Sequence, residues 1–78
     1  MVMIKKLILT NKSLNSIEII VEPYLEYIDL NPNEEAIIKI NGKNSKLDIE
    51  YHSDAIVLYD EHQNNIEIYL GNKLMYKS

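Results

Sequence analysis

Apolar side chains recur at every second position along most of this chain, and this alternation constrains the fold more than any other feature. Residues 17–22, 47–51 and 66–70 show it most clearly, with isoleucine, valine, leucine or tyrosine separated mainly by acids. A two-residue period is that of a half-buried β-strand, and these apolar residue types favour strands. No stretch longer than about ten residues has the 3.6-residue period of an amphipathic helix. The sequence therefore predicts an all-β protein.

Turn-forming residues divide the chain at fairly even intervals, which sets the number of strands. Seven clusters of this kind occur: Asn11-Lys12-Ser13, Glu22-Pro23, Asn31-Pro32-Asn33, Asn41-Gly42, Ser53-Asp54, Gln63-Asn64-Asn65 and Gly71-Asn72. Such clusters between apolar runs mark turns, so about eight strands are expected. One flat sheet of this size would leave too much apolar surface in water. We expect one domain over residues 1–78, a small jelly-roll-like antiparallel β-sandwich or a partly open barrel.

The two glycines predict two hairpins. Asn41-Gly42 favours a type I′ turn joining residues 36–40 to residues 46–51, with a bulge at residues 43–45. Gly71-Asn72 fits a two-residue turn between the last two strands.

The two prolines cannot donate hydrogen bonds to a sheet. Pro23 and Pro32 are therefore expected at strand starts or on edges. A helix is conceivable only at residues 31–35, where Pro32 could open a single turn.

The composition excludes several classes of protein. Without cysteine the chain can form no disulfide or thiolate metal site, and a secreted protein this small usually has disulfides, so a cytoplasmic location is expected. Lys5 and Lys6 interrupt the short apolar stretches near the N-terminus, which predicts neither signal peptide nor membrane span. Isoleucine, lysine, asparagine and tyrosine make up 36 of the 78 residues, which indicates an A/T-rich bacterial, phage or plasmid genome.

The charged residues disfavour nucleic-acid binding. The net charge is -4, and every cation is a lysine, so the guanidinium fork that reads phosphates and guanine edges is missing. Each glycine stands alone in its turn, and no glycine-rich phosphate-binding loop is present.

The two histidines are the residues most suited to catalysis or metal binding. A divalent metal could in principle be held by His52, Asp54, Asp60 and His62. These residues lack the defined spacing on one rigid element that metal sites usually show. A minimal enzyme using His52 with Asp54 would need His52 to reach a second titratable group in a cleft. We expect exposed turn histidines, no metal, no cofactor, no catalytic residue and no enzymatic activity.

Acidic residues are concentrated in the first half of the chain. From residue 13 to residue 38 there is no lysine, and six acids occur there, namely Glu18, Glu22, Glu26, Asp29, Glu34 and Glu35. If residues 17–22 and 26–30 form neighbouring strands, their polar sides make an acidic face that could steer a basic partner. The alternative is a solvated surface that keeps strand edges from pairing.

Several apolar residues occupy the phase that should face water. The expected inward set is Ile19, Ile38, Ile49, Leu58 and Ile68. The outward set then includes Ile20, Ile37, Val57, Tyr59 and Tyr69. Two explanations are open: these side chains are scattered, or covered by the terminal strands, residues 3–9 and 74–76, or else they form a patch that binds a second copy or another protein.

One segment resembles small standalone bacterial β-proteins of unassigned function. In those proteins a Glu-Pro-aromatic sequence precedes an alternating strand and a Leu-x-Pro-Gly-Glu sequence. This chain has Glu22-Pro23-Tyr24 and Leu30-Asn31-Pro32-Asn33-Glu34, with tyrosine where tryptophan is common and Asn33 in place of glycine. The resemblance covers a sixth of the chain, supports the sandwich and implies no activity.

The sequence therefore predicts a non-enzymatic protein that acts by protein–protein contact. It is expected to form a homo-oligomer and to serve as an inhibitor, immunity factor or assembly accessory, through Ile20, Ile37, Val57, Tyr59, Tyr69, Glu22, Glu26 and Asp29. The alternative is a carbohydrate- or small-ligand-binding module whose cleft is lined by Tyr24, Tyr27, Tyr51 and Asp54.

Overall fold

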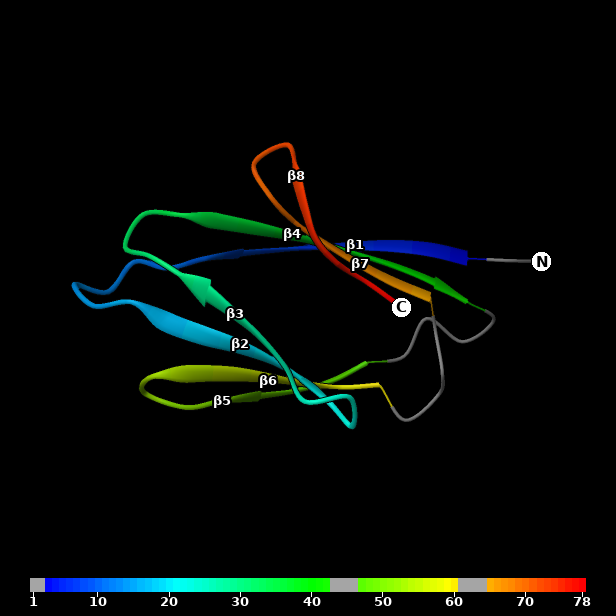
Figure 1. The fold of residues 1–78 in the computed structure, drawn as a ribbon, viewed down its shortest axis with the longest axis horizontal. Helices are drawn as coiled ribbons and strands as arrows, with labels where there is room; N and C mark the ends of the chain where they lie inside the picture. Colours follow the sequence, from blue (N-terminus) through cyan, green and yellow to red (C-terminus); the bar gives the residue numbers. More distant parts are fainter. Residues whose placement is uncertain (1–2, 43–46, 61–64) are drawn as a thin grey trace.

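Eight strands form two layers in the computed structural model, which describes residues 3–42, 47–60 and 65–78 (Figure 1). The strands are β1 (Met3–Thr10), β2 (Ile17–Glu22), β3 (Glu26–Leu30), β4 (Glu35–Gly42), β5 (Asp48–Tyr51), β6 (Ala55–Tyr59), β7 (Asn65–Leu70) and β8 (Lys73–Lys77). The described residues contain no helix, at residues 31–35 or elsewhere, and therefore none that could cross a membrane. The predicted all-β sandwich is confirmed.

Each layer is a four-stranded sheet. Sheet A has the order β1-β4-β7-β8, and sheet B has the order β3-β2-β6-β5. Neighbouring strands are antiparallel except β2 and β6, which run parallel and depart from the antiparallel arrangement that the sequence predicted. The chain passes from one sheet to the other four times, after β1, β3, β4 and β6. Strands that follow each other in the sequence are therefore often in different layers.

The predicted Asn41-Gly42 hairpin is wrong. Both residues are part of β4, which lies inside sheet A between β1 and β7. Asn41 pairs with Ile4 on one side and Asn65 on the other, so long-range pairing keeps this segment extended. The strand that follows, β5, belongs to sheet B. The bulge expected at residues 43–45 lies outside the described residues.

The predicted hairpin at Gly71-Asn72 is confirmed. Leu70 pairs with Lys73 across it, and Gly71 has a φ of 60°. A positive φ at the first of two turn residues is the mark of a type II′ turn, for which glycine is favoured.

The core lies between the two sheets and consists almost entirely of branched aliphatic side chains. All five residues of the predicted inward set belong to it: Ile19, Ile38, Leu58 and Ile68 are fully buried, and Ile49 packs against them half-buried. The alternation that the sequence showed is therefore the alternation between the core and the outer faces of the sheets.

The connection between β3 and β4 explains the Asn-Pro-Asn-Glu sequence. The amide of Glu34 donates to the carbonyl of Asn31 at 3.0 Å, and Asn33 has a φ of 67°. Proline followed by a left-handed residue is the pattern of a type II turn, in which glycine or asparagine occupies the third position. Pro32 thus lies in a turn, as Pro23 does after β2. Neither proline begins a strand.

The turn between β2 and β3 contains a second left-handed residue, and this one is costly. Leu25 has a φ of 56°, and its side chain is 59% exposed, so little packing offsets the backbone strain. The left-handed region costs a non-glycine residue about 1–2 kcal/mol, and Leu25→Gly removes this cost. Part of the gain is offset because glycine gives the unfolded chain more conformational entropy, so the net stabilisation should be roughly 0.5–1 kcal/mol. Thermal unfolding should shift upward by about 3–6 °C.

A matched control is Leu14→Gly, because Leu14 is also an exposed loop leucine but has no positive φ. This variant should melt at or below the wild-type temperature. Equal melting temperatures for the two variants would contradict the strain at Leu25.

Candidate interaction surfaces

The outer face of sheet B carries five carboxylates, which we call the acidic face. The carboxylates are Glu18, Glu22, Asp29, Asp48 and Glu50. The described residues of this face include no lysine. The predicted neighbours β2 and β3 do pair, and Glu18 stands directly opposite Asp29. Like charges opposite each other across two strands repel, so this pair is unfavourable.

An apolar row crosses the middle of the acidic face. Tyr27, Ile20 and Val57 form it, side by side on β3, β2 and β6, and Glu50 continues the row on the edge strand β5. Carboxylates occupy the rows on both sides of it, Asp29 and Glu18 on one side and Glu22 and Asp48 on the other. Val57 is only 8% exposed although it points outward, because it lies on an inner strand with Ile20 and Glu50 as its neighbours.

Tyr59 lies beside the apolar row, between Glu22 on β2 and Asp48 on β5. Its pKa is raised, first by desolvation, then by the negative charges of Glu50 and Glu22, and by a hydrogen bond to Glu50. The same Glu50 carboxylate also contacts His52 Nε2 at 2.5 Å. Tyr59 therefore stays a neutral hydrogen-bond donor at physiological pH, beside an acid-rich surface.

Not all of the acids in the first half of the chain belong to this face. Glu26 pairs with Val21, a core residue, so it lies in the inward phase at an exposed end of β3. Glu35 is the first residue of β4 in the other layer, and Glu34 lies in the turn before it. The expectation of an acidic face is met by Glu18, Glu22 and Asp29, joined by Asp48 and Glu50 from β5, which sequence reasoning did not include.

The outer face of sheet A has a different character. A row of Ile8, Ile37, Tyr69 and Leu74 crosses its four strands. A parallel row of Lys6, Lys39, Glu67 and Lys77 lies beside it. The Tyr69 hydroxyl donates to Glu67 Oε1 at 2.7 Å, and Lys39 Nζ stands 5.0 Å from the centre of the Tyr69 ring. This face combines apolar side chains with three lysines.

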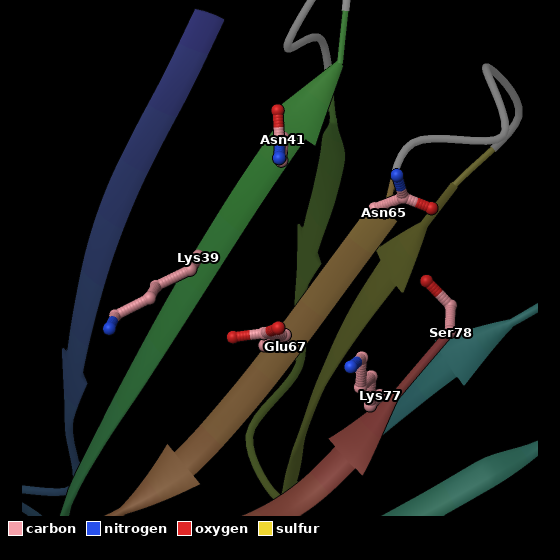
Figure 2. A pocket seen from close by; sticks show the side chains of 6 residues that line it. All are labelled: Lys39, Asn41, Asn65, Glu67, Lys77 and Ser78. Atoms are coloured by element: carbon pink, nitrogen blue, oxygen red, sulfur yellow. The ribbon is translucent and has the colours of Figure 1, made fainter.

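Two open depressions lie on the outer face of sheet A. The larger, of about 340 Å³, is lined by Lys39, Asn41, Asn65, Glu67, Lys77 and Ser78, and Figure 2 shows these side chains on β4 and β7 and at the end of β8. The smaller, of about 240 Å³, includes Ile37 and Tyr69. Neither is lined by the residues that the sequence suggested for a ligand cleft.

The predicted apolar patch is divided between two faces. Ile20, Val57 and Tyr59 lie on sheet B, whereas Ile37 and Tyr69 lie on sheet A. The terminal strands do not cover these residues, because β1 and β8 are edge strands in the plane of sheet A. Of the two explanations left open by the sequence, the residues are therefore separated rather than gathered in one patch, since the alternation determines which side chains point outward but not which sheet holds them.

The four residues proposed for a ligand cleft do not come together. Tyr24 lies in the turn after β2, whereas Tyr51 and Asp54 flank the β5–β6 turn at the opposite end of sheet B. Tyr27 stands between them on the acidic face. All three tyrosines are exposed, by 45% to 66%.

The histidine-centred alternatives gain no support from the geometry. His52 contacts Glu50 rather than Asp54, and both side chains are about half exposed, at 49% and 52%. Asp60 is at the far end of β6, some 15–20 Å away along a five-residue strand. His62 lies outside the described residues, and among those described no group of three or more metal-ligating side chains is found.

Sequence reasoning missed two buried polar residues. Asn11 is 2% exposed and Asp60 is 1% exposed. Asp60 lies at the end of sheet B, where its amide donates to the carbonyl of Glu22 at 2.9 Å. Burial raises the pKa of Tyr76, and the charges of Tyr24, Glu26 and Asp60 raise it further, so these groups lie close to one end of the sandwich.

Asn11 joins two loops at the opposite end. Its amide Nδ2 donates to the carbonyls of Leu30 and Asn15, both at 2.9 Å. Its Oδ1 accepts from the amide and the hydroxyl of Ser13, at 2.9 Å and 2.7 Å. The sequence offered one indication of this role, the turn-forming composition of residues 11–13. An asparagine side chain in a turn commonly accepts a hydrogen bond from the backbone two residues further on.

Comparisons with known proteins give no match: no protein-family model, no curated protein and no solved structure is significantly similar to this chain.

Proposed function

We propose that this protein works without catalysis, by binding a basic protein surface on its acidic face. The feature that carries the proposal is the combination, on one face of sheet B, of a central apolar row with four carboxylates in the two flanking rows and Glu50 at its end. Apolar centres with charged rims are typical of protein interfaces. Inhibitors, immunity factors and assembly accessories are the classes of small protein that fit such a role.

The repulsion within the acidic face favours a cationic partner. Glu18 and Asp29 face each other directly, and the described part of this face has no lysine that could offset them. A lysine or arginine placed between the two carboxylates converts this repulsion into attraction. Complementary charge of this kind raises the association rate and selects the partner.

Tyrosines give the same surface its short-range contacts. Tyr27 is 57% exposed at one end of the apolar row, and Tyr59 adds a neutral hydroxyl beside Glu22 and Glu50. Tyrosine is enriched among the residues that contribute most to interface affinity, because its ring is apolar and its hydroxyl can donate.

The test is a titration of the full chain, labelled with ¹⁵N, with a synthetic amphipathic peptide of lysine and leucine. We expect amide shifts on β2, β3 and β6. Neutralising the facing pair with Glu18→Gln and Asp29→Asn should weaken binding about tenfold, because two partly exposed ion pairs contribute about 0.5–1 kcal/mol each. Raising the salt concentration should weaken binding of the wild type more than that of this double variant.

The matched control neutralises two acids on the other outer face. Glu35→Gln with Glu67→Gln changes the net charge by the same amount on sheet A, and it should alter the affinity less than twofold. An equal loss in both double variants, or peptide-induced shifts confined to β1, β4 and β7, would refute the assignment to the acidic face. A peptide in which glutamate replaces lysine should not bind.

A further inference from the structure

The sandwich has four edge strands, and they differ in how open they are to pairing. The edges are β1 and β8 in sheet A and β3 and β5 in sheet B. The strands β3 and β5 have five and four residues and carry acids, and β8 has a register irregularity opposite Ile68 and Tyr69. Short length, charge and bulges are the features by which proteins protect an edge from pairing.

The edge at β1 is less protected, because it is the longest of the four edge strands and its only charges, Lys5 and Lys6, lie in its first half. It has eight residues, pairs with β4 along its whole length without a register shift, and contains no acid. Its second half contains the apolar run Leu7-Ile8-Leu9, in which Ile8 is 54% exposed. A long, regular and apolar edge is a template for adding another strand.

The hydrogen-bonding phase of β1 identifies the groups that are open. The amide of Asn11 donates to the carbonyl of Glu34 at 3.0 Å, so odd-numbered residues of this segment point their backbone groups toward β4. The amides and carbonyls of Lys6, Ile8 and Thr10 consequently point to the open edge. The neighbouring ladder agrees with this phase, because the carbonyl of Ile66 points toward β8 and accepts from Ser78.

We propose that β1 pairs with β1 of a second copy, antiparallel and centred on Ile8, so that two A sheets join into one continuous sheet. In this register Ile8 faces its own counterpart, and Leu7 faces Leu9 of the second copy. Lys6 faces Thr10, so no lysine stands opposite another lysine. The three open backbone positions then pair with each other, forming about six hydrogen bonds across the two-fold axis.

Charge complementarity selects this register and a second copy as the occupant. Within one chain Lys6 stands next to Lys39, a repulsive pair, and Thr10 stands next to Glu35. Joining the edges at Ile8 places Lys6 of one copy in the same row as Glu35 of the other, with Thr10 between them. The two backbones are then two strand spacings apart, about 10 Å, which the two long side chains can span. The proposal is independent of the acidic face and of any basic partner.

The test is sedimentation equilibrium of the full chain, at concentrations from micromolar to millimolar, on the wild type and five variants. The wild type should form a dimer. Ile8→Pro should raise the dimer dissociation constant more than 100-fold, because proline removes the central amide, which the isolated chain does not use. Ile8→Thr, which keeps that amide, should change the dissociation constant less than tenfold. Circular dichroism checks that each variant remains folded.

Charge variants keep the test decisive if Ile8→Pro fails to fold. Lys6→Glu alone should weaken the dimer, and adding Glu35→Lys to the same chain should restore it. Tyr69→Lys, on the outer face of sheet A, should leave the dimer intact. A wild type that stays monomeric at millimolar concentration, a charge swap that restores nothing, or a dimer lost in Tyr69→Lys would each overturn the proposal, the last in favour of face-to-face association.

Discussion

Replacing Ile38 by alanine should remove about half of the folding free energy of this protein. Ile38 lies in the middle of β4 with no exposed surface, between Leu7 on β1 and Ile68 on β7. Truncating a fully buried isoleucine costs about 2–5 kcal/mol, because the lost apolar contacts leave a cavity that the close-packed surroundings fill only in part. A domain of this size has only about 4–12 kcal/mol of stability in total.

The adjacent residue provides the control, because Ile37 has the same side chain on the same strand but points outward. Its neighbours are Ile8 and Tyr69 on the outer face of sheet A. Ile37→Ala should cost less than about 1 kcal/mol. In urea unfolding, with a slope of about 1 kcal/mol per molar, the two midpoints should then differ by about 2–3 M.

Equal losses in the two variants would mean that the assigned inward and outward phases of β4 are wrong. Ile38→Val covers the case in which Ile38→Ala does not fold, since losing one methylene should cost about 0.5–1.5 kcal/mol and leave a measurable midpoint. The same comparison separates the core from the outer face, on which contact with other molecules can be tested without unfolding the chain.

The sequence predicted the strands well because a two-residue period is a local property. Ile19, Leu58 and Ile68 could be assigned to the core from their spacing alone. Strand pairing is not local, and there the sequence was ambiguous. Asn41-Gly42 has the composition of a hairpin turn, yet pairing with β1 and β7 keeps it extended within β4.

The two outer faces illustrate the same limit. Ile20 and Ile37 both occupy the outward phase, and nothing near them in the sequence tells that one belongs to sheet B and the other to sheet A. Glu26 was grouped with the other acids, but its register opposite Val21 turns it to the inward phase. The acidic face could be anticipated only for the two strands that are consecutive and paired, β2 and β3.

Buried polar residues were the least predictable part of the structure. In the sequence Asn11 looks like an ordinary turn residue. Its burial arises because the end of β3, about twenty residues further along the chain, packs against it. Its backbone extends the contact, because the amide of Asn33 donates to the Asn11 carbonyl at 2.7 Å. The residue thus fixes both loops that cross between the sheets at this end (Figure 1).

Asn11→Asp should therefore lower the free energy of unfolding by about 3 kcal/mol, although it only replaces the side-chain amide nitrogen with an oxygen. The substitution replaces the Nδ2 donor with an oxygen that faces the carbonyls of Leu30 and Asn15. Both carbonyls lose their donor, and a carboxylate is placed where only 2% of the side chain meets water. Leaving buried polar groups unpaired costs about 1–3 kcal/mol, and more when one is charged.

Thermal unfolding measures this effect, with an expected fall of more than about 10 °C in a chain of this length. Asn15→Asp is the matched control, because it adds the same charge to the same loop on an exposed side chain, and it should change the stability by less than about 0.5 kcal/mol. Asn11→Ala should fall between the two, since it removes the donor without adding a charge. Similar melting temperatures for Asn11→Asp and Asn15→Asp would show that Asn11 does not hold the two loops together. These loops connect β1 to β2 and β3 to β4. Losing the Asn11 hydrogen bonds should therefore also increase local opening of β1, β2 and β3, which would be seen as faster amide hydrogen exchange in these strands.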